Sequence, residues 1–207
     1  LTAGAATRQV FNINRDWKFF FNSEVSSDGA LTVNLPHTWN TDALSGKKDY
    51  FRGIGNYLKE IDIPNEWRDK RVFIKGYGAN SICNVLVNGK HVGEHRAGYT
   101  AFAYEITDYL NFGRKNFFWL IVNNSPQMDV LPVAGDQNSY GGLFRDVELI
   151  VTGREIVSPT DRASDGLYVM QKNISAQKAE CETTVKVSGV RDNNVTAELT
   201  VLDDQMR

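Results

Sequence analysis

The residue types best suited to ligand chemistry lie in one long segment between two strand-like stretches. Residues 123–147 read NNSPQMDVLPVAGDQNSYGGLFRDV, a connection longer than structureless loops usually are. Its polar and aromatic members include Asp129, Asp136, Gln137, Asn138 and Tyr140. Carboxylates and amides hydrogen-bond hydroxyl groups, and an aromatic ring covers the apolar face of a sugar, so the segment is typical of polyol recognition. A loop whose polar side chains cap its own backbone explains the same residues equally well.

Other residues of catalytic types are better explained by structure than by chemistry. His37 and Trp39 follow a strand and a proline, where a histidine beside a tryptophan is more often a packed pair. Glu66 lies among charged neighbours in a turn, whereas a catalytic acid requires an apolar environment. The chain has no Gly-x-Ser-x-Gly or His-Glu-x-x-His motif, and its three histidines lack the spacing of a zinc site. We therefore expect no metal site.

The composition is that of a folded protein of ordinary polarity. A chain of 207 residues corresponds to one or two domains. Its net charge of −2 argues against nucleic acid or an anionic membrane as a partner. No apolar run is long enough to span a membrane. Cys83 and Cys181 are too few for a disulfide framework, and we expect both to be free and buried.

Alternation of apolar and polar residues predicts strands almost everywhere, with few helices. The expected strands are residues 17–21, 31–35, 57–63, 71–77, 82–87, 91–95, 117–122 and 144–151. Asn88-Gly89 predicts a tight hairpin turn, and residues 105–110 predict one or two helical turns. Strands at this spacing indicate an all-β sandwich.

A second unit is expected beyond a loose linker at residues 158–166. Residues 167–172, 181–187 and 195–202 each alternate like a strand. Three strands cannot close an immunoglobulin-like sandwich, which needs about seven. We therefore expect residues 154–207 to be the beginning of a truncated domain.

Several segments occur together in an order that resembles a known family. They are LPHTW at residues 35–39, YLKEIDIP at 57–64, VNGKHVGEH at 87–95 with GYTAF at 98–102, and GGLFRDV at 141–147. This set resembles the N-terminal sugar-binding domain of glycoside hydrolase family 2, in its bacterial β-galactosidase branch. The resemblance implies a jelly-roll β-sandwich of the galactose-binding-domain type at residues 9–153. It also implies a partial immunoglobulin-like β-sandwich at residues 154–207.

The resemblance further implies a parent enzyme that hydrolyses terminal β-linked sugars with retention of configuration. Its two catalytic glutamates would lie in a later (β/α)8 barrel, which needs about 250 residues and is not contained here. No catalytic residue is therefore expected in this chain, which alone should be inactive and should support its own C-terminal barrel. The family's first domain lends an aspartate to the sugar pocket; Asp136 is the first candidate and Asp129 the second. Arg145 and Asp146 are expected to be structural.

The resemblance favours a β-galactosidase, although β-glucuronidases and β-mannosidases share this first domain. Asn56 departs from the family, which usually has tryptophan at that position. The alternative is a non-catalytic carbohydrate-binding or surface adhesion module, because a fold does not fix a function. No cofactor is expected in this portion, while a divalent or sodium ion in the parent and a homo-oligomer stay open. The expected location is periplasmic or secreted, in a bacterium.

Overall fold

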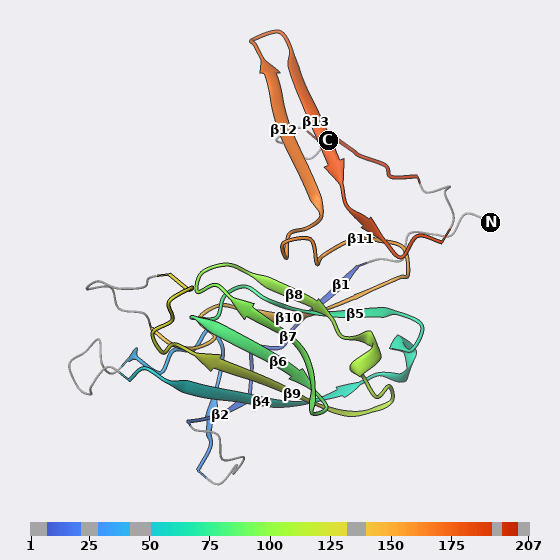
Figure 1. Cartoon of the computed structure of the whole chain (residues 1–207). Coiled ribbons are helices and arrows are strands. Elements are labelled where there is room, and N and C mark those ends of the chain that lie inside the picture. Colours follow the sequence, from blue (N-terminus) through green and yellow to red (C-terminus); the bar gives the residue numbers. More distant parts are fainter. Residues whose placement is uncertain (1–7, 22–28, 42–50, 132–139, 192–195, 203–207) are drawn as a thin grey trace.

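The protein consists almost entirely of β-strands, and its main body is two antiparallel sheets packed on each other (Figure 1). This computed structural model describes residues 8–21, 29–41, 51–131, 140–191 and 196–202. The six-stranded sheet has the order β3 (Leu31–Val33), β2 (Trp17–Phe21), β4 (Ile54–Ile63), β9 (Arg114–Asn123), β6 (Ile82–Val87), β7 (Lys90–Arg96). The four-stranded sheet has the order β1 (Gln9–Asn12), β10 (Val147–Thr152), β5 (Arg71–Gly76), β8 (Phe102–Glu105). The predicted all-β sandwich is confirmed.

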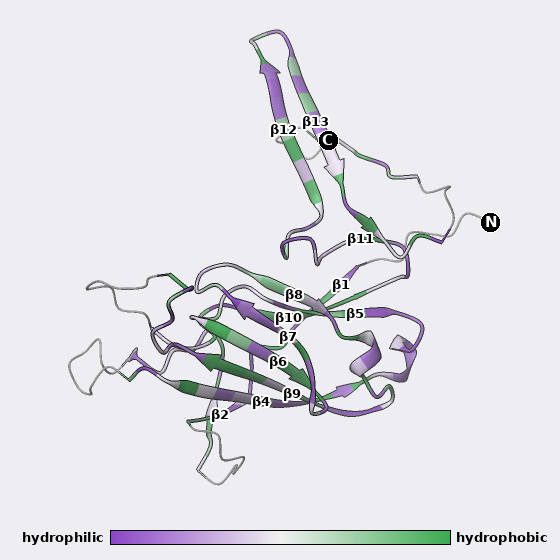
Figure 2. Ribbon diagram, in the orientation of Figure 1, coloured by the Kyte–Doolittle hydropathy of each residue, from purple (hydrophilic) through white to green (hydrophobic). Residues whose placement is uncertain are grey.

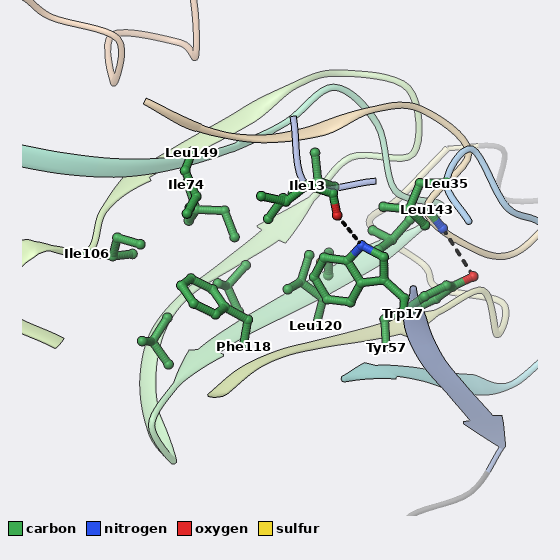
Figure 3. Packing of buried hydrophobic residues seen from close by; sticks show 14 of the residues in the cluster. Ile13, Trp17, Leu35, Tyr57, Ile74, Ile106, Phe118, Leu120, Leu143 and Leu149 are labelled. Atoms are coloured by element: carbon green, nitrogen blue, oxygen red, sulfur yellow. Dashed lines mark hydrogen bonds between the residues drawn. The ribbon is translucent and has the colours of Figure 1, made fainter. Parts of the chain in front are cut away.

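The core lies between the two sheets and follows from the alternation of the strands. In β9, Asn116, Phe118, Leu120 and Val122 are buried, while the residues between them are more exposed. Inward side chains of both sheets meet in one cluster, part of which Figure 3 shows. Trp17 is fully buried there, and its indole N–H donates to the Ile13 carbonyl at 2.7 Å. Burial of each such large side chain contributes about 1.5–3 kcal/mol.

The clearest sequence signals are confirmed by the structure. The strands expected at residues 17–21 and 82–87 coincide with β2 and β6. Asn88 and Gly89 have φ angles of 52° and 77°, and they turn the chain from β6 into β7. Glycine and asparagine accept positive φ angles more readily than other residues. The Asn-Gly pair therefore predicts this turn.

Short elements depart from the sequence-based prediction. β1 and β8 were not expected as strands, and both are only four residues long. The helix expected at residues 105–110 is the end of β8 followed by a single 3-10 turn, η2 (Thr107–Tyr109). A second turn, η1 (Asn65–Trp67), follows β4. Such pieces are too short to nucleate a helix, so sheet pairing decides their conformation. In the described ranges, no helix has the length and apolarity needed to cross a membrane.

Beyond Gly153 the described chain forms two small two-stranded sheets. They are β11 (Ile156–Val157) with β14 (Val187–Ser188), and β12 (Leu167–Ile174) with β13 (Ala179–Val185). The β12–β13 hairpin projects from the sandwich, and Figure 2 shows hydrophobic residues along it. The assignment of residues 154–207 to an immunoglobulin-like domain stays a prediction.

Two expectations for this second region were wrong. Residues 196–202 are exposed and form no strand, because alternation alone does not make a strand without a hydrogen-bonded neighbour. Cys181 is exposed on β13, since no other layer of the described chain packs against that hairpin, whereas Cys83 is buried in the core as expected. Both cysteines are free.

Candidate functional site

The long connection between β9 and β10 returns to the sandwich against the segment that follows β3. Residues 132–139, which include Asp136, Gln137 and Asn138, lie outside the described residues. On the returning side, the His37 N–H donates to the Leu143 carbonyl at 2.7 Å, and the Trp39 N–H donates to the Gly141 carbonyl at 3.3 Å. The base of the connection is therefore held in place by main-chain hydrogen bonds.

Two buried asparagines fix both ends of this connection. Asn40 is 1% exposed, and its Oδ1 accepts the Gly141 N–H at 2.6 Å while its Nδ2 donates to the Phe51 carbonyl at 2.9 Å. Asn124 is fully buried, accepts the Gly53 N–H at 2.8 Å, and contacts the Asn40 amide at 3.5 Å. An amide side chain can both donate and accept hydrogen bonds, so it can satisfy backbone N–H and carbonyl groups that have no partner in a neighbouring strand. The connection therefore leaves and returns at defined points.

Two glycines at the returning end allow the backbones to approach closely. A Cβ on Gly141 would lie 1.9 Å from the Trp39 ring. Gly142 has a φ of +129°, and a Cβ there would lie 2.4 Å from the His37 carbonyl oxygen. Only glycine fits both the space and the backbone angle at residue 142.

The half-buried His37 and the fully buried Tyr57 form a polar pair at this end of the connection. The Tyr57 hydroxyl lies 2.7 Å from His37 Nδ1. It also accepts the Leu143 N–H at 3.4 Å, a hydrogen bond that Figure 3 shows. Burial lowers the pKa of His37 and raises that of Tyr57, so both side chains are neutral at neutral pH. The His37 ring also packs on Phe19, at 4.8 Å between ring centroids. His37 is packed and hydrogen-bonded, as expected, but its partners are Tyr57 and Phe19 and not the neighbouring Trp39.

An aromatic cluster lies beside the described end of the connection. The rings of Tyr99, Tyr140 and Phe144 contact one another edge to face, with centroids 5.1–6.4 Å apart. Tyr99 is 43% exposed, and Arg145 lies over the Phe144 ring while donating to the Tyr99 carbonyl at 3.2 Å. Exposed tyrosine faces beside hydrogen-bonding groups suit the apolar face of a sugar ring. Tyr140 was part of the set predicted for polyol recognition.

Asp129, the second candidate for the sugar contact, is engaged by an arginine of β7. Its carboxylate accepts two hydrogen bonds from the Arg96 guanidinium, at 2.7 and 3.0 Å. The Arg96 guanidinium also holds the pKa of the Asp129 carboxyl below its usual value. Arg96 further donates to Glu94 at 3.1 Å, so Asp129 belongs to a surface ion-pair network. This carboxylate braces the outgoing end of the connection.

Asn80 is a buried polar residue that sequence reasoning did not single out. Its side chain is 0% exposed, and neither amide atom has a hydrogen-bond partner among the residues that the structure describes. The Asn80 N–H donates to the Gly142 carbonyl at 3.1 Å, which places it beside the returning connection. A Cβ on Gly98 would lie 2.7 Å from Asn80 Oδ1. Buried amides normally have partners, so Asn80 departs from the usual pattern of buried polar groups.

The remaining predicted residues have structural or surface positions. The Arg145 guanidinium donates to the Tyr77 carbonyl at 3.2 Å, and the Asp146 carboxylate accepts from the Asn14 amide at 2.7 Å. Glu66 is exposed in η1, as expected. Asn56 is buried, and its side-chain oxygen accepts the Trp119 indole N–H at 3.0 Å, which links β4 to β9. Among the described residues, no cluster of three or more His, Cys, Asp or Glu could hold a metal ion.

The described geometry is that of a β-sandwich in which both ends of the β9–β10 connection are anchored, and comparison with known proteins identifies the family. Residues 33–153 match the model for "Glycosyl hydrolases family 2, sugar binding domain", which is more than half of the chain. The chain therefore belongs to glycoside hydrolase family 2.

Named relatives fall into two activities. A β-glucuronidase of Bacteroides fragilis is 48% identical over 95% of this chain and 28% of that protein. A β-galactosidase of Thermoanaerobacter pseudethanolicus is 28% identical over 90% of this chain and 26% of that protein. The crystal structure of a Bacteroides uniformis β-glucuronidase superimposes with a TM-score of 0.79 at 34% identity, covering 86% of this chain and 22% of that one. The chain thus spans about a quarter of the length of these relatives.

Proposed function

We propose that the protein containing this chain hydrolyses terminal β-linked glycosides with retention, and that this domain forms one wall of the sugar pocket. The observation that carries the proposal is the family match over residues 33–153, which includes both ends of the β9–β10 connection. In a retaining mechanism one carboxylic acid protonates the leaving oxygen and a second carboxylate attacks the anomeric carbon. Both would come from a barrel elsewhere in the protein.

The role of this chain is to position the sugar, and Asp136 is the proposed contact. Asp129 is already paired with Arg96, which supports the choice of Asp136. Asn40 and Asn124 anchor the two described ends of the connection that carries this aspartate, which supports a role for the connection in the pocket wall. Tyr99 and Tyr140 would supply an apolar face beside it.

The sugar proposed first is a β-glucuronide, and the second is a β-galactoside. The relative named β-glucuronidase is 48% identical to this chain, against 28% for the relative named β-galactosidase. This order reverses the preference drawn from the sequence motifs, which the two activities share.

The test is hydrolysis of chromogenic β-glucuronide, β-galactoside and β-mannoside by the intact protein and, in parallel, by the 207-residue chain. We expect the intact protein to cleave the β-glucuronide and the chain alone to cleave none. Cleavage of only the β-galactoside or β-mannoside would overturn the choice of sugar. If the intact protein cleaves no glycoside but binds one, the alternative of a carbohydrate-binding or adhesion module replaces the enzyme.

A further inference from the structure

A basic cleft lies where the sandwich meets the region after Gly153. Its volume is about 310 Å³, and it is bordered by the turn from η1 into β5, by η2, and by the segments around Arg154 and Gly189. The charged residues that line it are Arg68, Asp69, Lys70, Arg71, Arg154 and Arg191. Five cations and one carboxylate thus line a small cleft in a chain whose net charge is −2. None of these residues belongs to the candidate sugar site described above.

One of the cations, Arg71, connects the elements that border the cleft. The Arg71 guanidinium pairs with both oxygens of Glu105, at 2.7 and 2.9 Å, and donates to the Arg154 carbonyl at 3.1 Å and to Ser188 Oγ at 2.9 Å. Gly189 completes this junction, because a Cβ there would lie 1.9 Å from the Arg154 carbonyl oxygen. Arg71 is therefore committed to joining the two regions and sets the relative position of the other cations.

Three other cations are exposed and uncommitted. Within the described ranges, no hydrogen bond or ion pair engages the side chain of Lys70, Arg154 or Arg191. Arg68 donates to the Asn65 amide oxygen at 3.0 Å, which is neutral. Asp69 is the one carboxylate in the lining, so positive charge is in excess there; like charges repel, and an anion that enters between them relieves the repulsion. Guanidinium groups also bind carboxylate and sulfate oxygens in a two-pronged manner.

We propose that this cleft binds an anionic sugar, through a sulfate ester or a uronate carboxylate held by Lys70, Arg154 and Arg191. A cleft of this size accommodates one charged sugar ring. The net negative charge of the chain disfavours a long polyanion such as nucleic acid. The choice of a sugar rests on the proposed function, whereas the preference for an anion rests on the lining alone.

The test uses two anionic oligosaccharides that are not β-glycosides, so that binding is independent of hydrolysis. They are a dextran sulfate oligosaccharide and an α-linked oligogalacturonate, with neutral dextran of equal length as the uncharged control. Titration calorimetry of the intact protein, at fixed ionic strength, measures the affinity for each. We expect at least one charged oligosaccharide to bind with one site per chain and neutral dextran to show no binding; which one binds identifies the charged group.

The matched variants remove equal charge inside and outside the cleft. Lys70→Gln with Arg154→Gln should weaken binding about tenfold or more, since two charge-assisted contacts are lost. Lys90→Gln with Arg15→Gln should leave the affinity within about twofold, because only screened surface charge changes. All four side chains are exposed, so neither variant threatens folding. The proposal is wrong if neither charged oligosaccharide binds, or if both double variants weaken binding equally. Failure of the glycoside panel, by contrast, would remove the proposed function and with it the reason for choosing a sugar, while the calorimetry would still decide whether the cleft binds an anion.

Discussion

Asn40→Ala should release the returning end of the β9–β10 connection without unfolding the sandwich. Asn40 is 1% exposed and is the acceptor for the Gly141 N–H at 2.6 Å. Loss of a buried partner costs about 1–3 kcal/mol per unsatisfied group. The Phe51 carbonyl would lose the Asn40 amide but would still accept the Trp39 indole N–H at 3.4 Å, so it adds little to this cost. We therefore expect a local loss of about 2 kcal/mol, which is roughly a 30-fold change in an opening equilibrium.

Hydrogen exchange followed by mass spectrometry measures this directly on peptides that cover residues 140–146. The expected result is about 30-fold faster exchange there, with unchanged exchange in β6 and β9. Thr41→Ala is the control, because Thr41 is exposed and, among the described residues, its hydroxyl donates to the Thr38 carbonyl alone, at 3.1 Å. Unchanged exchange at residues 140–146 in Asn40→Ala would refute the anchoring role of Asn40.

Three further changes test the packing and charge arguments. Gly142→Ala should destabilise the protein by about 1–3 kcal/mol in thermal or chemical unfolding, since its positive φ and the nearby His37 carbonyl leave no room for a Cβ; wild-type stability would contradict this. Burial lowers the pKa of His37 in the folded state below its unfolded value of 6.5, so protonation favours the unfolded chain. The contribution of neutral His37 to the free energy of unfolding is therefore fully present above pH 6.5 and is lost as the pH falls below it. His37→Gln should flatten that fall in unfolding measured across pH, whereas His91→Gln on the surface should not. Arg71→Met should lower the free energy of unfolding by about 1–2 kcal/mol and speed hydrogen exchange in β14, because the ion pair with Glu105 and the contact with Ser188 are lost. Unchanged exchange in β14 would contradict the role of Arg71 in joining the two regions.

Local signals in the sequence predicted most of the sandwich. Alternation located the long strands, and Asn88-Gly89 located a turn whose φ angles are indeed positive. The short strands β1 and β8 escaped prediction because four residues carry too little periodicity, and pairing with distant strands forms them. The strand expected at residues 195–202 failed for the opposite reason: the pattern is present, but residues 196–202 have no strand neighbour in the described structure.

The candidate site depended on contacts between residues far apart in the sequence. The long connection and its polar residues were recognisable, and Asp129 is described, whereas Asp136 lies outside the described residues. The pair formed by Asp129 and Arg96 could not be foreseen, because 33 positions separate them. Asn80 had no signal at all, since burial without a partner is a property of the folded chain only.

The most direct test of the account compares Asp136→Asn with Asp129→Asn in the intact protein, by kcat/KM on whichever glycoside the panel shows to be cleaved. Loss of a charged hydrogen bond to a sugar hydroxyl should lower kcat/KM by about tenfold or more in Asp136→Asn. Asp129→Asn should change it less than about threefold, because that carboxylate is bound to Arg96. A pocket wall built by this connection predicts that contrast. Wild-type kcat/KM in Asp136→Asn, or an equal loss in both variants, would contradict it.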